Sequence, residues 1–110
     1  MARRLFKIAL VILVPLTISC VSVDPYIYFQ EQLQAEVGES IDAVPPSSWR
    51  VRPDLVFKAP LPNGHIEYHY EFENIRGLCR FALEVDPATR KILGWRYDGE
   101  DKDKACFFVQ

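Results

Sequence analysis

The sequence contains few of the residues from which catalytic and nucleotide-binding motifs are built. Its 110 residues include five glycines, three cysteines and two histidines. It has no glycine-rich phosphate-binding loop and no G-x-S-x-G turn that would expose a nucleophilic serine. Ser47 and Ser48 lie in a proline-bounded stretch with no histidine near them in the sequence. We therefore predict that the protein is not an enzyme, needs no cofactor and binds no small-molecule substrate.

The sequence also lacks a hydrophobic run as long as a typical membrane-spanning helix. Its longest apolar stretch, Ile8–Ile18, is apolar except for Thr17 and follows a start with three basic and no acidic residues. A spanning helix needs about 20 apolar residues, whereas a basic start and a shorter apolar stretch are typical of an export signal. We predict a signal peptide over residues 1–19, with an uncleaved anchor as the alternative.

Cys20 ends this stretch, in the segment Leu16-Thr17-Ile18-Ser19-Cys20. The segment resembles a bacterial lipobox, in which a small residue precedes a cysteine that is acylated and becomes the new N-terminus. The resemblance implies a lipid such as palmitate on Cys20 and a tether over residues 20–24. The short length of the rest of the chain predicts a single domain over residues 25–110. Each buried CH₂ contributes about 0.8 kcal/mol, so the acyl chains would hold the protein at a membrane. A secretory signal without lipid is the alternative.

Basic residues become scarcer once the predicted signal is removed. The remaining chain has ten Lys and Arg residues against fifteen Asp and Glu residues, with no basic run. Nucleic-acid partners require a basic patch, so the composition disfavours them. The negative charge also disfavours binding to anionic lipid headgroups. We therefore predict contact with the membrane through the N-terminal lipid alone, and another envelope protein as the partner.

Two cysteines, Cys79 and Cys106, remain if Cys20 is acylated. An even number of cysteines in an exported domain is typical of a disulfide, so we predict one bridge between them. Closing this loop is expected to stabilise the domain by about 3–4 kcal/mol. Two buried free thiols are the alternative.

The mature chain begins with a pattern typical of a helix. Asp24-Pro25 supplies an N-cap followed by proline at the first helical position, and apolar residues then recur at helical spacing up to Val37. Gly38 is placed to end this helix. Ser40 is placed to cap a second, short helix that the prolines Pro45-Pro46 would stop.

The remainder of the chain alternates apolar and polar residues, as strands of an antiparallel sheet do when one face is exposed to water. The predicted strands cover Leu55–Ala59, His65–Glu73, Leu78–Asp86, Ile92–Tyr97 and Ala105–Val109, and an Asn63-Gly64 turn joins the first two. Leu55, Phe57 and Ala59 are expected on one face of their strand. The predicted fold is α+β: one or two N-terminal helices packed on an antiparallel meander of three to five strands, with one disulfide.

One predicted strand carries five polar residues of the types that bind metals, and they alternate along it: His65, Glu67, His69, Glu71 and Glu73. Neighbours two apart on one strand face lie about 6–7 Å apart, so a His–Glu pair could hold a metal, whereas the two histidines are too distant to share one. We expect instead a solvated polar strand face and no metal. The segment Asp98–Lys104 lacks the spacing of a calcium loop and is expected to be a charged loop.

Trp49, Arg50 and Arg52 are the candidate partner-binding residues, in a loop over residues 47–53. Tryptophan and arginine most often carry the binding energy of protein interfaces, so an exposed Trp49 would serve as an anchor. The alternative is that Trp49 folds down to cap the core. Exposed edge strands offer strand addition as a second mode of recognition.

The chain also resembles the small outer-membrane lipoproteins of the BamE/SmpA type. The resemblance rests on a helix, the element Gly38-Glu39-Ser40 that opens a second helix, and a meander with a P-N-G turn and a Tyr-x-Tyr strand over Leu61–Val85. The segment CRFALEVDPATRKILGWRYDGEDKDKAC, residues 79–106, resembles small proteobacterial lipoproteins with a cysteine pair. Pro45-Pro46 departs from the glycine-proline step that is usual there.

The resemblance implies a place on the periplasmic face of the outer membrane and a role in outer-membrane assembly. A valine, and not an aspartate, follows Cys20, which by resemblance to enterobacterial lipoproteins also favours the outer membrane. The predicted function is therefore a non-enzymatic structural, assembly or protein-binding module of the bacterial cell envelope. The alternative is a periplasmic inhibitor of a hydrolase such as lysozyme, because an acidic protein suits a basic target.

Overall fold

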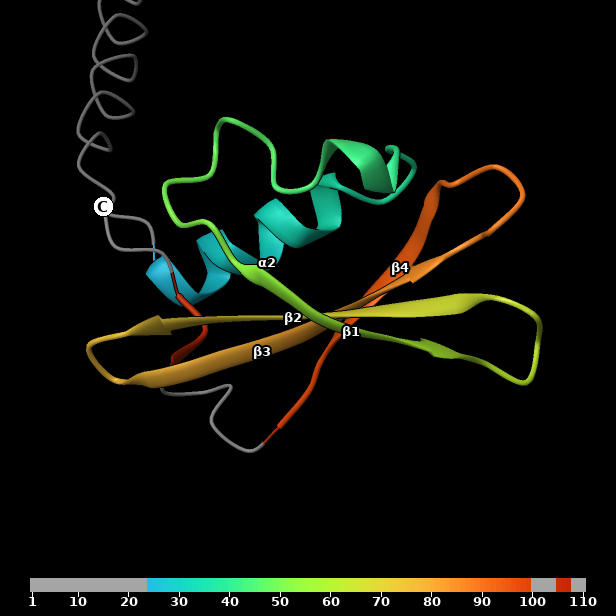
Figure 1. Ribbon diagram of the computed structural model, residues 1–110. Helices are drawn as coiled ribbons and strands as arrows, with labels where there is room; N and C mark the ends of the chain where they lie inside the picture. Colours follow the sequence, from blue (N-terminus) through green and yellow to red (C-terminus); the bar gives the residue numbers. More distant parts are fainter. Residues whose placement is uncertain (1–23, 100–104, 108–110) are drawn as a thin grey trace, which may run out of the picture.

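The computed structural model describes residues 24–99 and 105–107 and has an α+β fold. One layer is a four-stranded antiparallel sheet, and the other is a helix with the loops that follow it (Figure 1). The elements in chain order are helix α2 (Pro25–Ala35), a 3-10 helix (Ile41–Ala43), and strands β1 (Asp54–Pro60), β2 (Ile66–Asn74), β3 (Gly77–Val85) and β4 (Ile92–Tyr97). The predicted fold class is confirmed. Cys20 and the predicted signal, residues 1–19, lie outside the described residues.

Helix α2 begins where the sequence predicts. The Asp24 carboxylate accepts a hydrogen bond of 2.8 Å from the backbone N–H of Tyr26, and Pro25 is the first helical residue. Phe29 and Leu33, four residues apart, are completely buried against the sheet. Within the described part of the chain, no helix has the length and apolar character that crossing a bilayer requires.

The segment after α2 is joined to the start of β4. Gly38 has φ +94°, a conformation that favours glycine, and its N–H donates to the carbonyl of Ile92 at 2.8 Å. The Ile92 N–H in turn donates to the carbonyl of Glu39 at 2.9 Å. The predicted second helix is the 3-10 helix, whose N-cap is Ser40. These contacts hold the helical layer at one edge of the sheet.

The sheet has the order β1-β2-β3-β4, so β1 and β4 are its edges. A bulge interrupts β1 between Leu55 and Phe57: Leu55 pairs with Tyr70, and Phe57 pairs with His69, the next residue of β2. An extra residue in one strand reverses the alternation beyond it. The expectation that Leu55 and Phe57 share a face is therefore wrong, and the two side chains lie on opposite faces.

The core is centred on Phe29. Its ring centroid lies 5.6 Å from that of Phe72, 5.8 Å from that of Phe81 and 6.4 Å from that of Trp49. Edge-to-face aromatic pairs at such distances stabilise a core beyond the area they bury. Trp49 is only 3% exposed, so the interpretation of this residue as an exposed anchor is wrong. The indole completes the apolar layer between α2 and the sheet.

The disulfide between Cys79 and Cys106 is confirmed, with a Cα–Cα distance of 4.8 Å. Both cysteines are buried in the core, as predicted for a bridge between the sheet and the helical layer. The predicted last strand is wrong for its described part, because residues 105–107 do not join the sheet. The Asn74 side-chain amide donates to the carbonyl of Ala105, so the bridge and a side chain hold this segment without a strand ladder.

Candidate functional site

The face of the sheet opposite α2, here called the outer face, carries no covering helix or strand in the described part of the chain (Figure 1). Cross-strand pairing places the following side chains on it: Asp54, Phe57, Ala59, Glu67, His69, Glu71, Glu73, Arg80, Ala82, Glu84 and Arg96. Asp98 follows β4 and is joined to β3 by a hydrogen bond from its N–H to the Arg80 carbonyl.

His69 lies near the middle of the outer face and is buried. Its Nε2 is 2.9 Å from Oε1 of Glu67, and its Nδ1 is 2.8 Å from Oδ2 of Asp98. Ionised carboxylates only accept hydrogen bonds, so both contacts are hydrogen bonds at once only when the ring carries two protons. His69 therefore links strand β2 to the chain after β4, with both ring nitrogens occupied.

Glu67 is bound from a second side by Arg96 of β4. The guanidinium contacts both carboxylate oxygens, with Nε–Oε2 at 2.7 Å and Nη2–Oε1 at 2.8 Å. This bidentate contact, together with the charges of Arg96 and His69, holds the pKa of Glu67 below its usual range against the opposing effect of burial. Bidentate pairs of this kind are among the stronger charged hydrogen bonds in proteins.

These contacts correct the expected solvated face of β2. Glu67 and His69 are 9% and 7% exposed, whereas Glu73 at the end of the strand is exposed. His65 and Glu71 are half-buried. Nδ1 of His65 lies 2.6 Å from Oε2 of Glu84 on β3. The alternation is thus correct, but Glu84, Arg96 and Asp98 supply partners for the polar side chains of this face.

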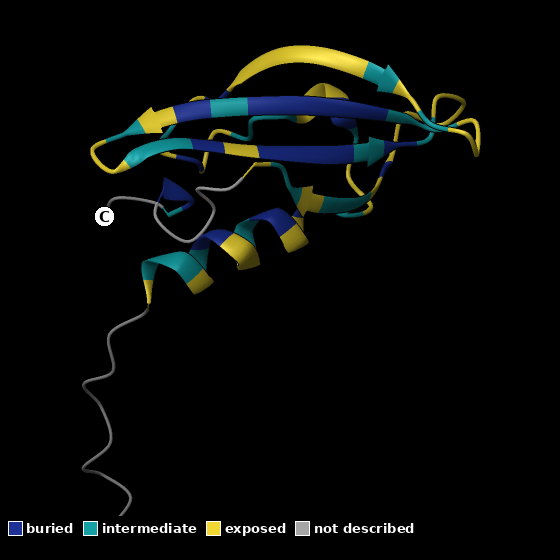
Figure 2. Cartoon of the chain, turned by 90° about the horizontal axis from the view of Figure 1, so that it is seen from below, coloured by how far each residue is buried: buried dark blue, intermediate teal, exposed yellow. Residues whose placement is uncertain are grey.

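The bulge places Phe57 over His69. The two rings stack with centroids 4.2 Å apart and an interplanar angle of 12°. Phe57 is nevertheless 51% exposed, and its neighbours Leu55 and Val56 are 45% and 51% exposed. Figure 2 shows that β1 is exposed over most of its length beside the buried middle of β2 and β3. This edge is an apolar surface in contact with solvent.

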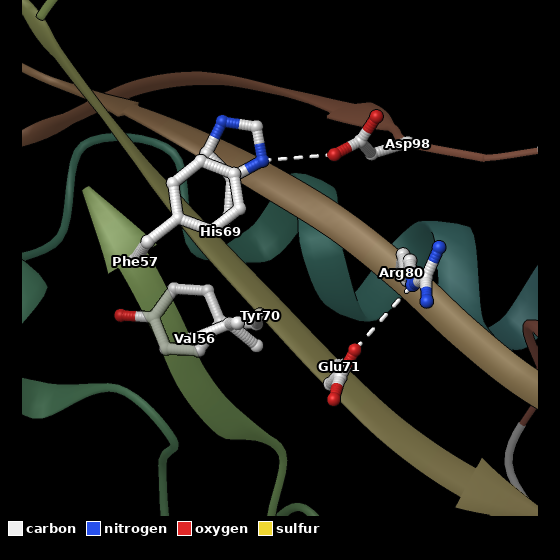
Figure 3. Close-up of a pocket in the computed structure, with 7 residues that line it drawn as sticks. All are labelled: Val56, Phe57, His69, Tyr70, Glu71, Arg80 and Asp98. Carbon is white, nitrogen blue, oxygen red and sulfur yellow. Dashed lines mark hydrogen bonds and ion pairs between the residues drawn. The ribbon is translucent and has the colours of Figure 1, made fainter. Parts of the chain in front are cut away.

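A hollow of about 190 Å³ opens beside the stacked rings (Figure 3). Its walls are aromatic and apolar on one side and charged on the other, and it is lined by Val56, Phe57, His69, Tyr70, Glu71, Arg80 and Asp98. Burial raises the pKa of Tyr70 from its ordinary value of 10 to about 12. A second hollow of about 140 Å³ lies beside Arg96, toward β4.

The charged residues at the end of the first hollow form a row across three strands. Asp54 of β1 pairs in register with Glu71 of β2, which pairs with Arg80 of β3. The Arg80 Nε is 3.4 Å from Oε2 of Glu71, and the Arg80 side chain is 54% exposed. The row therefore presents two adjacent carboxylates and one weakly held guanidinium to solvent.

The predicted binding residues lie elsewhere. Trp49 is in the core, while Arg50 and Arg52 are exposed on the loop that precedes β1. The Nη1 of Arg52 lies 3.5 Å from the carbonyl of Pro46, a long hydrogen bond. The structure does not bring these three side chains together as one exposed surface.

Among residues 24–99 and 105–107, no group of three or more histidine, cysteine or acidic side chains is arranged to hold a metal ion. The charged segment expected over Asp98–Lys104 is described only at Asp98 and Gly99. Asp98 is not a solvated loop residue, because it binds His69 and lies 3.6 Å from Nη1 of Arg96.

The sequence interpretation missed Phe57, Arg80, Arg96 and Asp98 as residues of the outer face. The available signal was the isolated charge within otherwise apolar strands: Arg80 stands among buried residues of β3, and Arg96 among aromatic residues of β4. Pairing these positions with the polar face of β2 requires the strand register. No feature of the sequence indicates that Phe57 lies on the outer face, because its position there depends on the bulge in β1.

No model of a protein family, no curated protein and no solved structure matches this chain. The resemblance to the BamE/SmpA type therefore stays a prediction, and the functional argument rests on the geometry of the outer face.

Proposed function

We propose that this chain is a non-enzymatic, protein-binding module of the bacterial cell envelope that uses the outer face and the exposed edge of β1. The observation that carries the proposal is that Val56 and Phe57, two adjacent exposed apolar residues of β1, line a charged hollow. Contiguous exposed apolar residues bordered by polar ones are typical of protein interaction sites. Hollows of small-molecule sites usually measure about 300–1,000 Å³, so a space of about 190 Å³ suits one side chain of a partner.

The arrangement of polar groups on the outer face also favours binding over catalysis. Both ring nitrogens of His69 are engaged by carboxylates, and Glu67 is engaged by Arg96. A general base needs a free acceptor within reach of the proton it removes. These residues therefore support a fixed surface more readily than a proton-transfer step.

Photo-crosslinking in living cells tests the binding proposal. A photoreactive phenylalanine analogue is placed at Phe57, and in a second variant at Glu31, an exposed position on α2. We expect one discrete crosslinked protein from position 57 and none from position 31. Equal crosslinking at both positions, or none at position 57, would contradict the proposed surface.

We further propose that the module is held at the outer membrane by a lipid on Cys20. The support is the lipobox-like segment that ends at Cys20 and the use of both remaining cysteines in one bridge. Metabolic labelling with an alkyne fatty acid is expected to label the wild type and not Cys20→Ala. Label on neither protein would remove the lipid anchor and leave a secreted or helix-anchored protein.

A second candidate function is inhibition of a hydrolase such as lysozyme. The observation that favours it is the excess of carboxylates on the outer face, which suits a basic enzyme. Adding the purified protein to a lysozyme assay decides this point. Unchanged hydrolysis at a large molar excess of the protein would eliminate lysozyme as the target and would leave the binding proposal intact.

A further inference from the structure

We infer that the outer face recognises a basic segment of its protein partner, whose Lys or Arg side chain lies over Phe57 and reaches the carboxylates beside it. The inference rests on the proposed binding function and names the chemistry of the partner. Three features carry it: the distribution of unpaired charge, the exposed ring of Phe57 and the size of the hollow.

Negative charge on the outer face is concentrated at one corner. The acidic residues farther along the face are paired: Glu67 with Arg96 and His69, and Glu84 with His65. At the other end, Asp54 and Glu73 are exposed and form no ion pair with any residue that the structure describes. Together with Glu71 they form what we call the acidic corner.

The acidic corner is electrostatically unfavourable without a cation. Asp54 lies directly opposite Glu71 in the register of β1 and β2, and like charges in such pairs destabilise a sheet. Glu73 is two residues farther along the same face, about 6–7 Å away. Arg80 supplies only one contact of 3.4 Å to Glu71. A partner's cation placed here would relieve the repulsion.

Phe57 supplies a surface for the same cation. One face of its ring stacks on His69, yet half of the residue is exposed. Lysine ammonium and arginine guanidinium groups bind to aromatic faces within about 6 Å of the ring centroid. Because Phe57 and Glu71 of the acidic corner line the same hollow, one basic side chain can contact both. Figure 3 shows Phe57 and Glu71 on the rim of the same hollow.

Strand addition at the edge of β1 fits the geometry less well than this side-chain contact. The bulge at Val56 interrupts the regular spacing of the backbone groups, and Pro60 lacks an N–H at the end of the strand. Bulges, lysine and proline at an edge oppose pairing with another strand, and β1 also carries Lys58. Recognition by side chains on the outer face does not require an unbroken edge.

Arg80 provides the sharpest test, because a basic and an acidic partner would use it in opposite ways. For a basic partner Arg80 is a competitor that must turn away from Glu71, which its exposure and its single long contact permit. For an acidic partner Arg80 would be the main anchor. Replacing Arg80 with glutamine should therefore tighten the binding of a basic segment and weaken that of an acidic one.

The experiment uses the full chain in neutral detergent and two probe peptides of equal length, one alternating Lys with Val and one alternating Glu with Val. Binding is followed by changes in the NMR signals of the labelled protein. We expect the Lys peptide to bind and to shift the amide signals of Phe57 and Glu71, with an affinity that falls as salt is added. The Glu peptide is expected to bind more weakly.

Three variants complete the test. The double variant Asp54→Asn with Glu71→Gln should weaken binding of the Lys peptide by roughly 2- to 30-fold, the range expected for two exposed ion pairs. The control is the double variant Glu31→Gln with Glu39→Gln, which removes the same number of charges from exposed positions of the helical layer. Its affinity for the Lys peptide should equal that of the wild type. Arg80→Gln should bind the Lys peptide more tightly than the wild type.

The outcomes separate this inference from the proposed function. The inference of a basic partner would be overturned by any of four outcomes: preference for the Glu peptide, equal binding of both peptides, binding of neither, or weaker binding of the Lys peptide by Arg80→Gln. A specific crosslink at Phe57 would still support a protein-binding surface in all these cases. Absence of that crosslink would contradict the binding function itself.

Discussion

At the scale of single residues, hydrogen bonds and ion pairs on the outer face allow a small domain to bury charged side chains. Glu67 and His69 are nearly covered, and their polar side-chain atoms are engaged by each other, by Arg96 and by Asp98. Removing one member of such a group leaves the others buried without a partner, which costs more than the pair contributes. The residues are therefore interdependent.

The ion pair of Glu67 predicts a dependence of stability on pH. Arg96 lowers the pKa of Glu67 below its ordinary value of 4.5, so folding favours the charged carboxylate. Its stabilising contribution is complete above pH 4.5 and is lost as the pH falls through the lower folded value. Urea unfolding at pH 7 and at pH 3 should show Glu67→Gln less stable than the wild type, with a smaller difference at pH 3.

The matched control for this prediction is Glu31→Gln, an exposed position on α2. Its free energy of unfolding should equal that of the wild type at both pH values. A gap between Glu67→Gln and the wild type that stays constant from pH 7 to pH 3 would show that the carboxylate charge does not contribute.

The burial of Trp49 predicts a large effect of its removal. The residue is 3% exposed and packs against Phe29 and Phe81. Trp49→Ala should lower the free energy of unfolding by about 3–5 kcal/mol, as for other large aromatic residues of a core. Arg50→Ala, at the next position, should change it by no more than about 0.5 kcal/mol. Denaturant unfolding measures both, and similar values for the two would place Trp49 outside the core.

At the scale of elements, the sequence predicts the helix and the strands because their signals are local. Asp24-Pro25 marks the helix start, and unbroken alternation marks β2 and β3. The bulge in β1 has no such signal, since it depends on how two strands are paired. That single irregularity moved Phe57 to the outer face and so created the candidate site that sequence reasoning missed.

The turn after α2 predicts a cost for adding a side chain at Gly38. Its φ of +94° is unfavourable for any residue with a Cβ atom, although no atom lies within 4 Å of the added carbon. Gly38→Ala should therefore destabilise the protein by about 1–2 kcal/mol through the backbone alone. Gly94→Ala is the control, because it has the same open space and no positive φ. Equal thermal unfolding temperatures for the two variants would contradict this explanation.

At the scale of the whole molecule, two layers with one aromatic core follow from the sequence pattern, and the disulfide follows from counting cysteines. Trp49 could be placed either in the core or on the surface by sequence alone, and only the packing around Phe29 decides between them. Of the predicted strand over residues 105–109, the described residues 105–107 lie outside the sheet, where the bridge to Cys79 holds them without a strand ladder.

The disulfide predicts the behaviour of the reduced protein. Cys79 and Cys106 are 27 positions apart, and closing a loop of that length contributes about 3–4 kcal/mol in the chain-entropy model. The double variant Cys79→Ala with Cys106→Ala should lose about that amount in denaturant unfolding. Cys20→Ala should keep its full stability. A double variant as stable as the wild type would show that the bridge does not stabilise the fold.

The start of α2 and the last described residues lie at the same end of the sheet, where the rings of Tyr26 and Phe107 are 5.2 Å apart (Figure 1). The turn at Asn63-Gly64 lies at the opposite end, beyond β1 and β2. Exposed turns tolerate insertions well, so a label inserted at Asn63-Gly64 would lie far from the start of α2 and leave that end of the sheet unobstructed.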